Sequence, residues 1–180
     1  MVRYNATEMF PIVDEYGKVI GSATRKECHS CKMLLHPVVH LHVFDKSGRL
    51  YLQKRSTNKD IQPGKWDTSV GGHVDYGESV EEALRREASE ELGLMMDSYK
   101  ALFRYSFESE VERELVHSFM CVVDEDAVRF DPVEIEEGRF FKMAEIECLV
   151  SAGLTTPNFA LEFDRLRVAL PTEQMCGWNR

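Results

Sequence analysis

Three glutamates are spaced so that a helix would bring their carboxylates together. Glu87, Glu90 and Glu91 stand at i, i+3 and i+4, which at about 100° per residue places them within one sector of a helix. Like charges at i and i+4 destabilise a helix by a few tenths of a kcal/mol, and acids in its C-terminal half face the wrong end of the helix dipole. A chain that keeps such a cluster gains oxygen ligands for a hard divalent cation such as Mg²⁺.

A helix with a defined start and end must present these acids. Ser79 followed by Glu82 has the pattern of an N-terminal capping box. Gly93 is suited to end the helix. The alternative is a solvated amphipathic helix in which Glu82, Arg86 and Glu90 form ion pairs at i and i+4.

Apolar runs separated by turn residues predict strands on both sides of this helix. The expected elements are an N-terminal hairpin over about residues 8–24, a second hairpin from 38–45 and 50–55, an extended stretch at 66–74, strands at 99–107, 115–123 and 139–142, and a C-terminal helix at about 158–170. This order predicts one domain over residues 1–180, an α/β sandwich with a mixed sheet.

The composition fits a globular enzyme and argues against other classes. The chain has 180 residues and is 43% hydrophobic, which is enough apolar content for a core. A net charge of −9 argues against a nucleic-acid partner, and no apolar run approaches the ~20 residues of a membrane span. The N-terminal stretch lacks the apolar core of a signal peptide, and the five cysteines form no disulfide framework. We therefore expect a cytoplasmic protein.

The segment from Gly72 to Leu94, GHVDYGESVEEALRREASEELGL, resembles the Nudix box. This box is the signature of a family that hydrolyses diphosphates linked to some other moiety. The glycine, the glutamate six residues later and the run from Arg86 to Leu94 match it in register. Ala88 stands where a larger aliphatic is usual, which should only thin the packing. The resemblance implies the Nudix fold, an α/β/α sandwich with a mixed β-sheet.

The resemblance also implies roles for the residues of the box. Glu87, Glu90 and Glu91 would carry metal, joined by the backbone carbonyl of Gly71, and the catalytic group would be these three acids with Arg86. Arg86 would orient a glutamate by a charge-assisted hydrogen bond, and Gly72 and Glu78 would support the ligands. Which carboxylate is the general base stays open. We expect Glu90 and Glu91 to be chiefly ligands and Glu87 to be ligand or base.

The implied reaction is substitution at phosphorus by water, with Mg²⁺ or Mn²⁺ as the cofactor. The expected substrate is a nucleoside diphosphate derivative or a similar small metabolite, and the sequence does not say which one. Neither nucleic acid nor a membrane is expected as a partner. Many relatives are dimers, so both a monomer and a homodimer stay open.

A second resemblance is to isopentenyl-diphosphate isomerase, a Nudix-fold enzyme that moves a double bond. It is carried by the stretches VDEYGKVIGSATRKECH, LLHPVVHLHVF and KWDTSVGGHV. That enzyme builds a metal site from three histidines and two glutamates. The matching residues of this chain would form a second metal site: His29, His36, His73, Glu112 and Glu114. Zn²⁺, Mn²⁺ or Mg²⁺ would suit such a mixed set. The alternative is that these are separate strand-end histidines and solvated hairpin acids.

One departure separates the two activities. The isomerase needs a cysteine immediately before the glycine that opens the box, and Gly71 stands there in this chain. Glycine has no side chain that could move a proton, whereas the box itself is complete. We therefore expect a Nudix hydrolase, with the isomerase as the alternative. A non-catalytic ligand sensor built on a Nudix domain is the third hypothesis.

Several other residues could have either a structural or a functional role. Cys28 and Cys31 form a C-x-x-C pair, but the chain offers no second pair to complete a zinc site. Lys54 and Arg55 are the expected phosphate-binding cations of the loop region that also carries Lys59 and Lys65. Trp66 could stack a base, although a core position is favoured.

Overall fold

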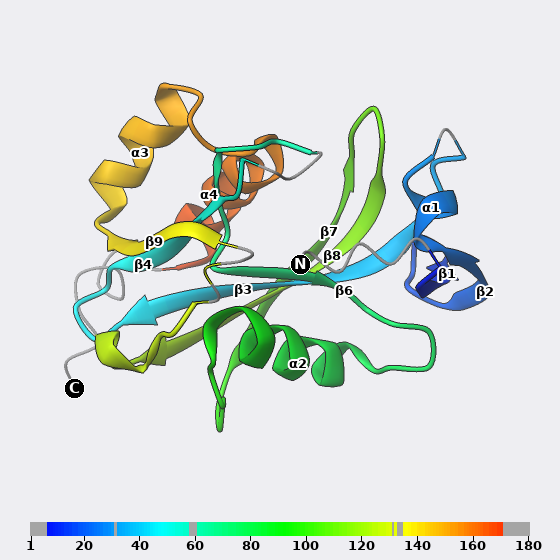
Figure 1. Cartoon of the computed structure of the whole chain (residues 1–180), viewed down its shortest axis with the longest axis horizontal. Coiled ribbons are helices and arrows are strands. Elements are labelled where there is room, and N and C mark those ends of the chain that lie inside the picture. The colour runs from blue at the N-terminus through cyan, green and yellow to red at the C-terminus, as the bar shows by residue number, and fades with distance from the viewer. Residues whose placement is uncertain (1–6, 31, 58–60, 131, 133–134, 171–180) are drawn as a thin grey trace.

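The computed structural model describes residues 7–30, 32–57, 61–130, 132 and 135–170 (Figure 1). The elements in chain order are β1 (Met9–Val13), β2 (Val19–Thr24), α1 (Arg25–Cys28), β3 (His36–Asp45), β4 (Leu50–Arg55), β5 (Trp66–Asp67), β6 (Val70–His73), α2 (Val80–Leu92), β7 (Lys100–Glu108), β8 (Arg113–Val123), the 3₁₀ turn η1 (Glu125–Ala127), β9 (Ile135–Phe141), α3 (Met143–Ser151) and α4 (Pro157–Ala169). The Cys31 of the C-x-x-C pair, Lys59 and the tail 171–180 lie outside the described residues.

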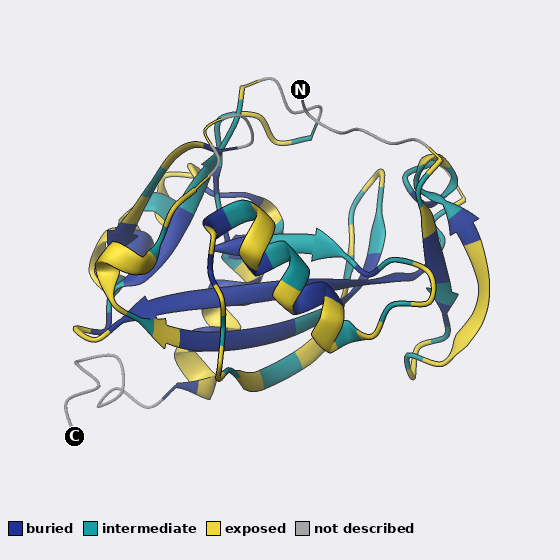
Figure 2. Cartoon of the chain, turned by 60° about the horizontal axis from the view of Figure 1, so that its bottom comes forward, coloured by how far each residue is buried: buried dark blue, intermediate teal, exposed yellow. Residues whose placement is uncertain are grey.

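A parallel strand pair lies at the centre of the main sheet. β3 and β8 run side by side from the partners His36 and Glu114 to the partners Asp45 and Val123. The neighbouring pairs of that sheet, including β7 with β8 and β6 with β3, are antiparallel. The sheet is therefore mixed, as the sequence predicted. β3 is buried along its whole length (Figure 2).

Helices cover the two faces of this sheet, which confirms the α/β sandwich (Figure 1). Successive strand residues point to opposite faces. Val39, Leu41 and Val43 of β3 pack in one core cluster with the buried residues of α2. Phe44 belongs to a second cluster with Phe159, Phe163 and Leu166 of α4. The intervening His40 and His42 of β3 contact Glu162 of α4.

β3 and β4 form a shorter hairpin than the sequence predicted. Within the described residues, Phe44 and Leu50 are the strand partners that join β3 and β4. β4 then diverges and pairs with β5 and β9. Ser69 lies where the strands part: its Oγ accepts a hydrogen bond from the Val43 amide at 2.9 Å and donates one to the Tyr51 carbonyl at 2.5 Å. The expected single stretch 66–74 is correspondingly two strands, β5 on the β4 side and β6 on the β3 side.

Local signals explain the ends of the helices. α2 begins with the predicted capping box of Ser79 and Glu82 and ends at Gly93, which is left-handed at φ 63°. α4 begins at Pro157 after the Thr156 cap. α3 was not predicted, and its segment carries a capping arrangement between Lys142 and Glu145. β9 also begins earlier than the predicted residue 139, at Ile135.

The N-terminal hairpin and the core position of Trp66 are both present in the structure. β1 and β2 form an antiparallel pair beside the start of β3 (Figure 1). Trp66 is a core residue, 9% exposed and packed edge-on against Phe141. No helix in the described part of the chain is long and apolar enough to cross a membrane.

Candidate active site

Arg86 forms hydrogen bonds both with the loop at the start of the Nudix box and with an acid of α2. Its Nε and one terminal nitrogen each donate to a different oxygen of Glu78 at 2.9 Å, and the same terminal nitrogen donates to the carbonyl of His73 at 2.9 Å. The other terminal nitrogen donates to Glu87 at 2.7 Å. These contacts hold the box loop, α2 and the end of β6 in one arrangement.

Two of the three box acids of α2 lie against the sheet, and the third is exposed to solvent. Glu91 accepts hydrogen bonds from the side chain of Gln53 at 3.0 Å and from the amide of Gly71 at 3.4 Å. Glu87 lies against Gly72, where an added Cβ would be 2.0 Å from its carboxyl carbon. The side chain of Glu90 is 65% exposed, with an oxygen 3.6 Å from Arg86. Glu87 and Glu91 thus face the two glycines of β6, and Glu90 stands apart from them.

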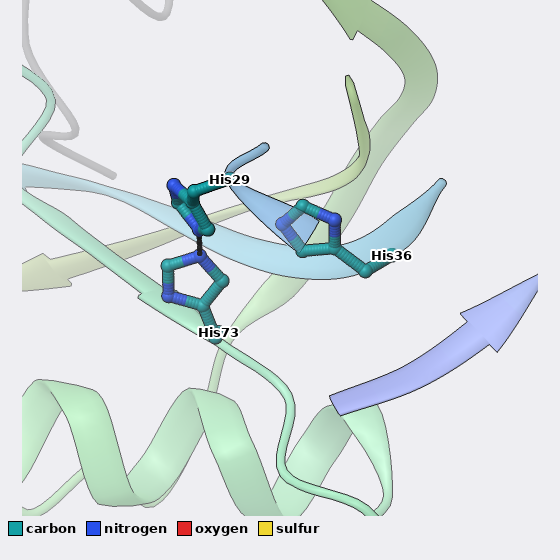
Figure 3. A group of neighbouring side chains, drawn as sticks. All are labelled: His29, His36 and His73. Atoms are coloured by element: carbon teal, nitrogen blue, oxygen red, sulfur yellow. Dashed lines mark hydrogen bonds between the residues drawn. The ribbon is translucent and has the colours of Figure 1, made fainter. Parts of the chain in front are cut away.

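Three histidines gather where α1, β3 and β6 meet (Figure 3). His29 follows α1, His36 begins β3 and His73 ends β6. The Nε2 atoms of His29 and His73 are 3.0 Å apart, and one ligand atom from each of the three residues lies within 4.8 Å of the others. Among the described residues this is the one set of three or more potential ligands at such spacing. The acids of α2 are not brought together to that distance.

The protonation states of these histidines favour metal binding. Burial, followed by the nearby imidazole of His36, lowers the pKa of His29 to about 4. Burial also lowers the pKa of His36 and of His73. Nδ1 of His36 lies 2.8 Å from the carbonyl of Leu34, so its hydrogen is on Nδ1, and its buried Nε2 has no hydrogen-bond partner. Neutral imidazoles with a free nitrogen are the form that binds a metal.

The two glutamates matched by the isomerase resemblance lie beside this histidine group. An oxygen of Glu112 is 3.5 Å from Nδ1 of His29, and Glu114 is the strand partner of His36. Burial and the neighbouring carboxylate of Glu112 raise the pKa of Glu114 to about 8. Burial raises the pKa of Glu112 as well, and the guanidinium of Arg55 partly opposes this. A cation bound beside these two acids would favour their ionised form, which burial alone disfavours.

The two groups of candidate ligands lie on opposite sides of β6. Alternation along this strand turns Gly71 and His73 to the α4 side and Gly72 to the α2 side. An added Cβ at Gly71 would meet Thr68 and His40 at 3.4–3.6 Å, which is ordinary contact, whereas at Gly72 it would overlap Glu87. Of the described cysteines, Cys28 and Cys121 are buried in core clusters and Cys148 is exposed on α3. The position of the isomerase cysteine therefore has room for a Cβ in ordinary contact with Thr68 and the imidazole of His40.

The predicted phosphate-binding cations have carboxylate partners. Lys54 lies 3.0 Å from Glu136 of β9. Arg55 lies 3.1 Å from Asp67 and is close enough to Glu112 and Glu114 to influence the pKa of both. Arg55 is thus better placed than Lys54 to meet an anion in this region.

Sequence reasoning missed two polar groups on the α4 side of the sheet. Glu162 contacts His40 and His42, and the Tyr105 hydroxyl donates to Asn158 at 2.7 Å, which in turn donates to Glu114 at 3.3 Å. The available signal was the pair of histidines two residues apart in an otherwise apolar strand. Their carboxylate partner is 122 positions away from His40, so no local pattern identifies it.

Comparison with known proteins agrees with this geometry. Residues 34–158 match the family described as NUDIX domain. An uncharacterized Nudix hydrolase of Yersinia pestis is 35% identical over 130 residues, covering 72% of this chain and 70% of that protein. An isopentenyl-diphosphate Delta-isomerase of Streptomyces griseus is 34% identical over 178 residues, covering 94% and 90%. The solved structure of DR0079 from Deinococcus radiodurans is 28% identical with a TM-score of 0.77, covering 88% of this chain and 98% of that one.

The family match covers more than half of the chain, and both relatives align over more than two thirds of their own length. The relatives bear the names of two activities, hydrolase and isomerase. The complete box, and the glycine at position 71 in place of a cysteine, agree with the first. The chain therefore belongs to the Nudix family, as a Nudix hydrolase of the branch that resembles isopentenyl-diphosphate isomerase.

Proposed function

We propose that this protein is a Mg²⁺- or Mn²⁺-dependent hydrolase that cleaves the diphosphate linkage of a nucleoside diphosphate derivative or a similar small metabolite. The observation that carries the proposal is the placement of Glu87 and Glu91 against the glycines of β6, with Arg86 fixing Glu87. A box that is complete in sequence, with two of its acids against the strand, supplies the oxygen ligands that a hard divalent cation prefers.

The residues present fit a divalent cation. Glu87, Glu91 and the carbonyl of Gly71 would hold it on one side, with Glu90 joining by a change of rotamer from its exposed position. When bound, the cation supplies a lowered pKa for a water ligand and neutralisation of charge on the phosphoryl oxygens. The protein's own acids would accept the proton of the attacking water, and Arg86 would keep Glu87 oriented.

The histidine group fits a second cation. The orphaned Nε2 of His36 and the neutral state of all three imidazoles support this assignment. We propose that His29, His36 and His73, with Glu112 and Glu114, bind a second metal on the α4 side of β6. Such a mixed nitrogen and oxygen set suits Zn²⁺, Mn²⁺ or Mg²⁺.

Isopentenyl-diphosphate isomerase is the second candidate because this histidine and glutamate group is the one that its resemblance implies. The absence of a side chain at Gly71 disfavours it. We expect the wild-type protein to leave the double bond of isopentenyl diphosphate unmoved. Gly71→Cys should fold, since an added Cβ meets neighbours only at ordinary contact distances, and any isomerase activity gained by that variant would identify the missing group.

The test is turnover against a panel of diphosphate metabolites with Mg²⁺ or Mn²⁺, read by mass spectrometry and including isopentenyl diphosphate. Glu91→Gln should lower cleavage by roughly a hundredfold or more, and Glu81→Gln, the same change at an exposed position of the first turn of α2, should not. Full activity in Glu91→Gln would reject the assignment of Glu91. Isomerisation without cleavage, or ligand binding without either, would replace the hydrolase by the isomerase or by a sensor.

A further inference from the structure

Gln53 of β4 contacts one of the box acids and has no role in the assignments above. Its side-chain nitrogen Nε2 donates to Oε2 of Glu91 at 3.0 Å. The backbone amide of Gly71 donates to the same oxygen at 3.4 Å. A donor from β4 and a donor from β6 thus meet a carboxylate of α2 at one atom. Two donors on one oxygen restrict the rotation of the carboxyl group and so fix where the other oxygen, Oε1, lies.

The backbone of Gln53 is held on both sides. Its strand partner on β5 is Asp67, and its strand partner on β9 is Gly138. Because β4 lies between two strands at this residue, its backbone cannot shift without breaking hydrogen bonds of the sheet. The side chain is half-buried. The sheet therefore presents the amide of Gln53 from a fixed position.

The donor that reaches Glu91 from β4 differs in charge from the donor to Glu87. Arg86 donates to Glu87 through a guanidinium at 2.7 Å, whereas Gln53 donates through a neutral amide. A guanidinium offsets part of the negative charge that attracts a metal ion, and a neutral donor does not. Gln53 can therefore orient Glu91 and leave its negative charge to a divalent cation.

We propose that Gln53 is a positioning residue for metal binding at the box: its side-chain amide holds Glu91 in the orientation in which the carboxylate binds a divalent cation. The inference rests on the proposed function for the presence of that cation. It adds to the metal site a residue of β4, which lies outside the Nudix box of residues 72–94. The box acids alone are then insufficient for full metal affinity.

The test is a Mg²⁺ titration of the wild-type protein and of Gln53→Met, followed by the NMR amide signals of Gly71 and Gly72. Methionine is similar to glutamine in length but has no N–H group to donate. We expect Gln53→Met to weaken Mg²⁺ binding by roughly tenfold to a hundredfold, the range for a group that orients a metal ligand. The amide signal of Gly71 should also shift in EDTA, before metal is added, because its acceptor on Glu91 is no longer held.

Tyr51→Phe is the matched control on the same strand. Among the described residues, the hydroxyl of Tyr51 has no hydrogen-bond partner, so its removal should leave Mg²⁺ affinity unchanged. A double variant separates positioning from a general loss of structure. When Glu91→Ala is already present, Gln53→Met should weaken the remaining Mg²⁺ binding by no more than about twofold, because the group that it orients is gone.

Wild-type affinity in Gln53→Met, or the same fold loss with and without Glu91, would overturn the inference even if hydrolysis were found. An equal loss in Tyr51→Phe would overturn it too, because the effect would then belong to the strand and not to the amide. Mg²⁺ binding that depends on Gln53 in a protein that cleaves none of the metabolites would instead overturn the proposed function and leave this inference standing.

Discussion

Gly71 and Gly72 are neighbours in β6, yet the two positions would respond differently to a side chain. Gly72→Ala would push the carboxyl group of Glu87 from its place, because the new Cβ would lie 2.0 Å from its carboxyl carbon. Glu87 is a flexible side chain, so the free energy of unfolding should fall by no more than about 1–3 kcal/mol. Mn²⁺ affinity, measured by calorimetry, should fall at least tenfold.

Gly71→Ala is the comparison for that experiment. Its Cβ meets Thr68 and His40 at 3.4 Å or more, so Glu87 stays in place and Mn²⁺ affinity should be kept. Equal losses of metal affinity in both variants would show that Glu87 is not a ligand.

The His40–Glu162 pair predicts a decline of stability in mildly alkaline solution. The pKa of His40 is raised from 6.5 to about 9 in the folded protein, so the stabilisation is fully present below pH 6.5 and is lost as the pH rises through 9. The groups that face the ring are Glu162 from α4, Glu114 from β8 and Asp67 from β5. Urea unfolding in EDTA at pH 6, 7.5 and 9 should show this decline in the wild-type protein. In His40→Gln the decline should be smaller, and an identical slope would count against the charged pair.

At the scale of elements, the N-terminal cap stabilises α2, the helix that carries the box acids. The hydroxyl of Ser79 accepts a hydrogen bond from the amide of Glu82, and the carboxylate of Glu82 accepts one from the amide of Ser79 at 2.8 Å. Ser79→Ala should therefore cost about 1 kcal/mol of unfolding free energy, measured in urea. Ser89→Ala, an exposed position inside the same helix, should be neutral or slightly stabilising, since alanine has the higher helix propensity. A loss as large in Ser89→Ala would refute the capping explanation.

The helices and strands that could be predicted from the sequence are those whose ends or patterns depend on neighbouring residues. The capping box of Ser79, the Gly93 that ends α2 and the apolar runs of β7 and β8 can each be recognised in a short stretch of sequence. The parting of β3 from β4 was not, because it depends on Ser69 bonding to both strands from a distant segment. The histidine group was found only through a family resemblance, and the His40–Glu162 pair was missed because tertiary packing alone brings its members together.

At the scale of the whole molecule, the two groups of acids in a chain of net charge −9 predict stabilisation by metal. A divalent cation at 100 times its dissociation constant should raise the free energy of unfolding by about 2.7 kcal/mol. The measurement is the thermal unfolding temperature with Mn²⁺ and after chelation. Glu91→Gln and His36→Ala should each remove part of this increase. An unfolding temperature that is the same with and without metal would argue against both proposed sites.

The parallel pairing of β3 with β8 has a consequence for how the protein folds. His36 and Glu114 are strand partners although 78 positions separate them (114 − 36), so the loop between them must close before the pair can form. Closing a long loop has an entropic cost that contacts repay only afterwards, which slows folding. Glu114 cannot join His29, His36 and His73 until this pairing exists, so the proposed site of three histidines and two glutamates is incomplete before it. In a refolding experiment we therefore expect metal capture to follow the formation of α2, so that the time of capture would report on the closure of the central sheet.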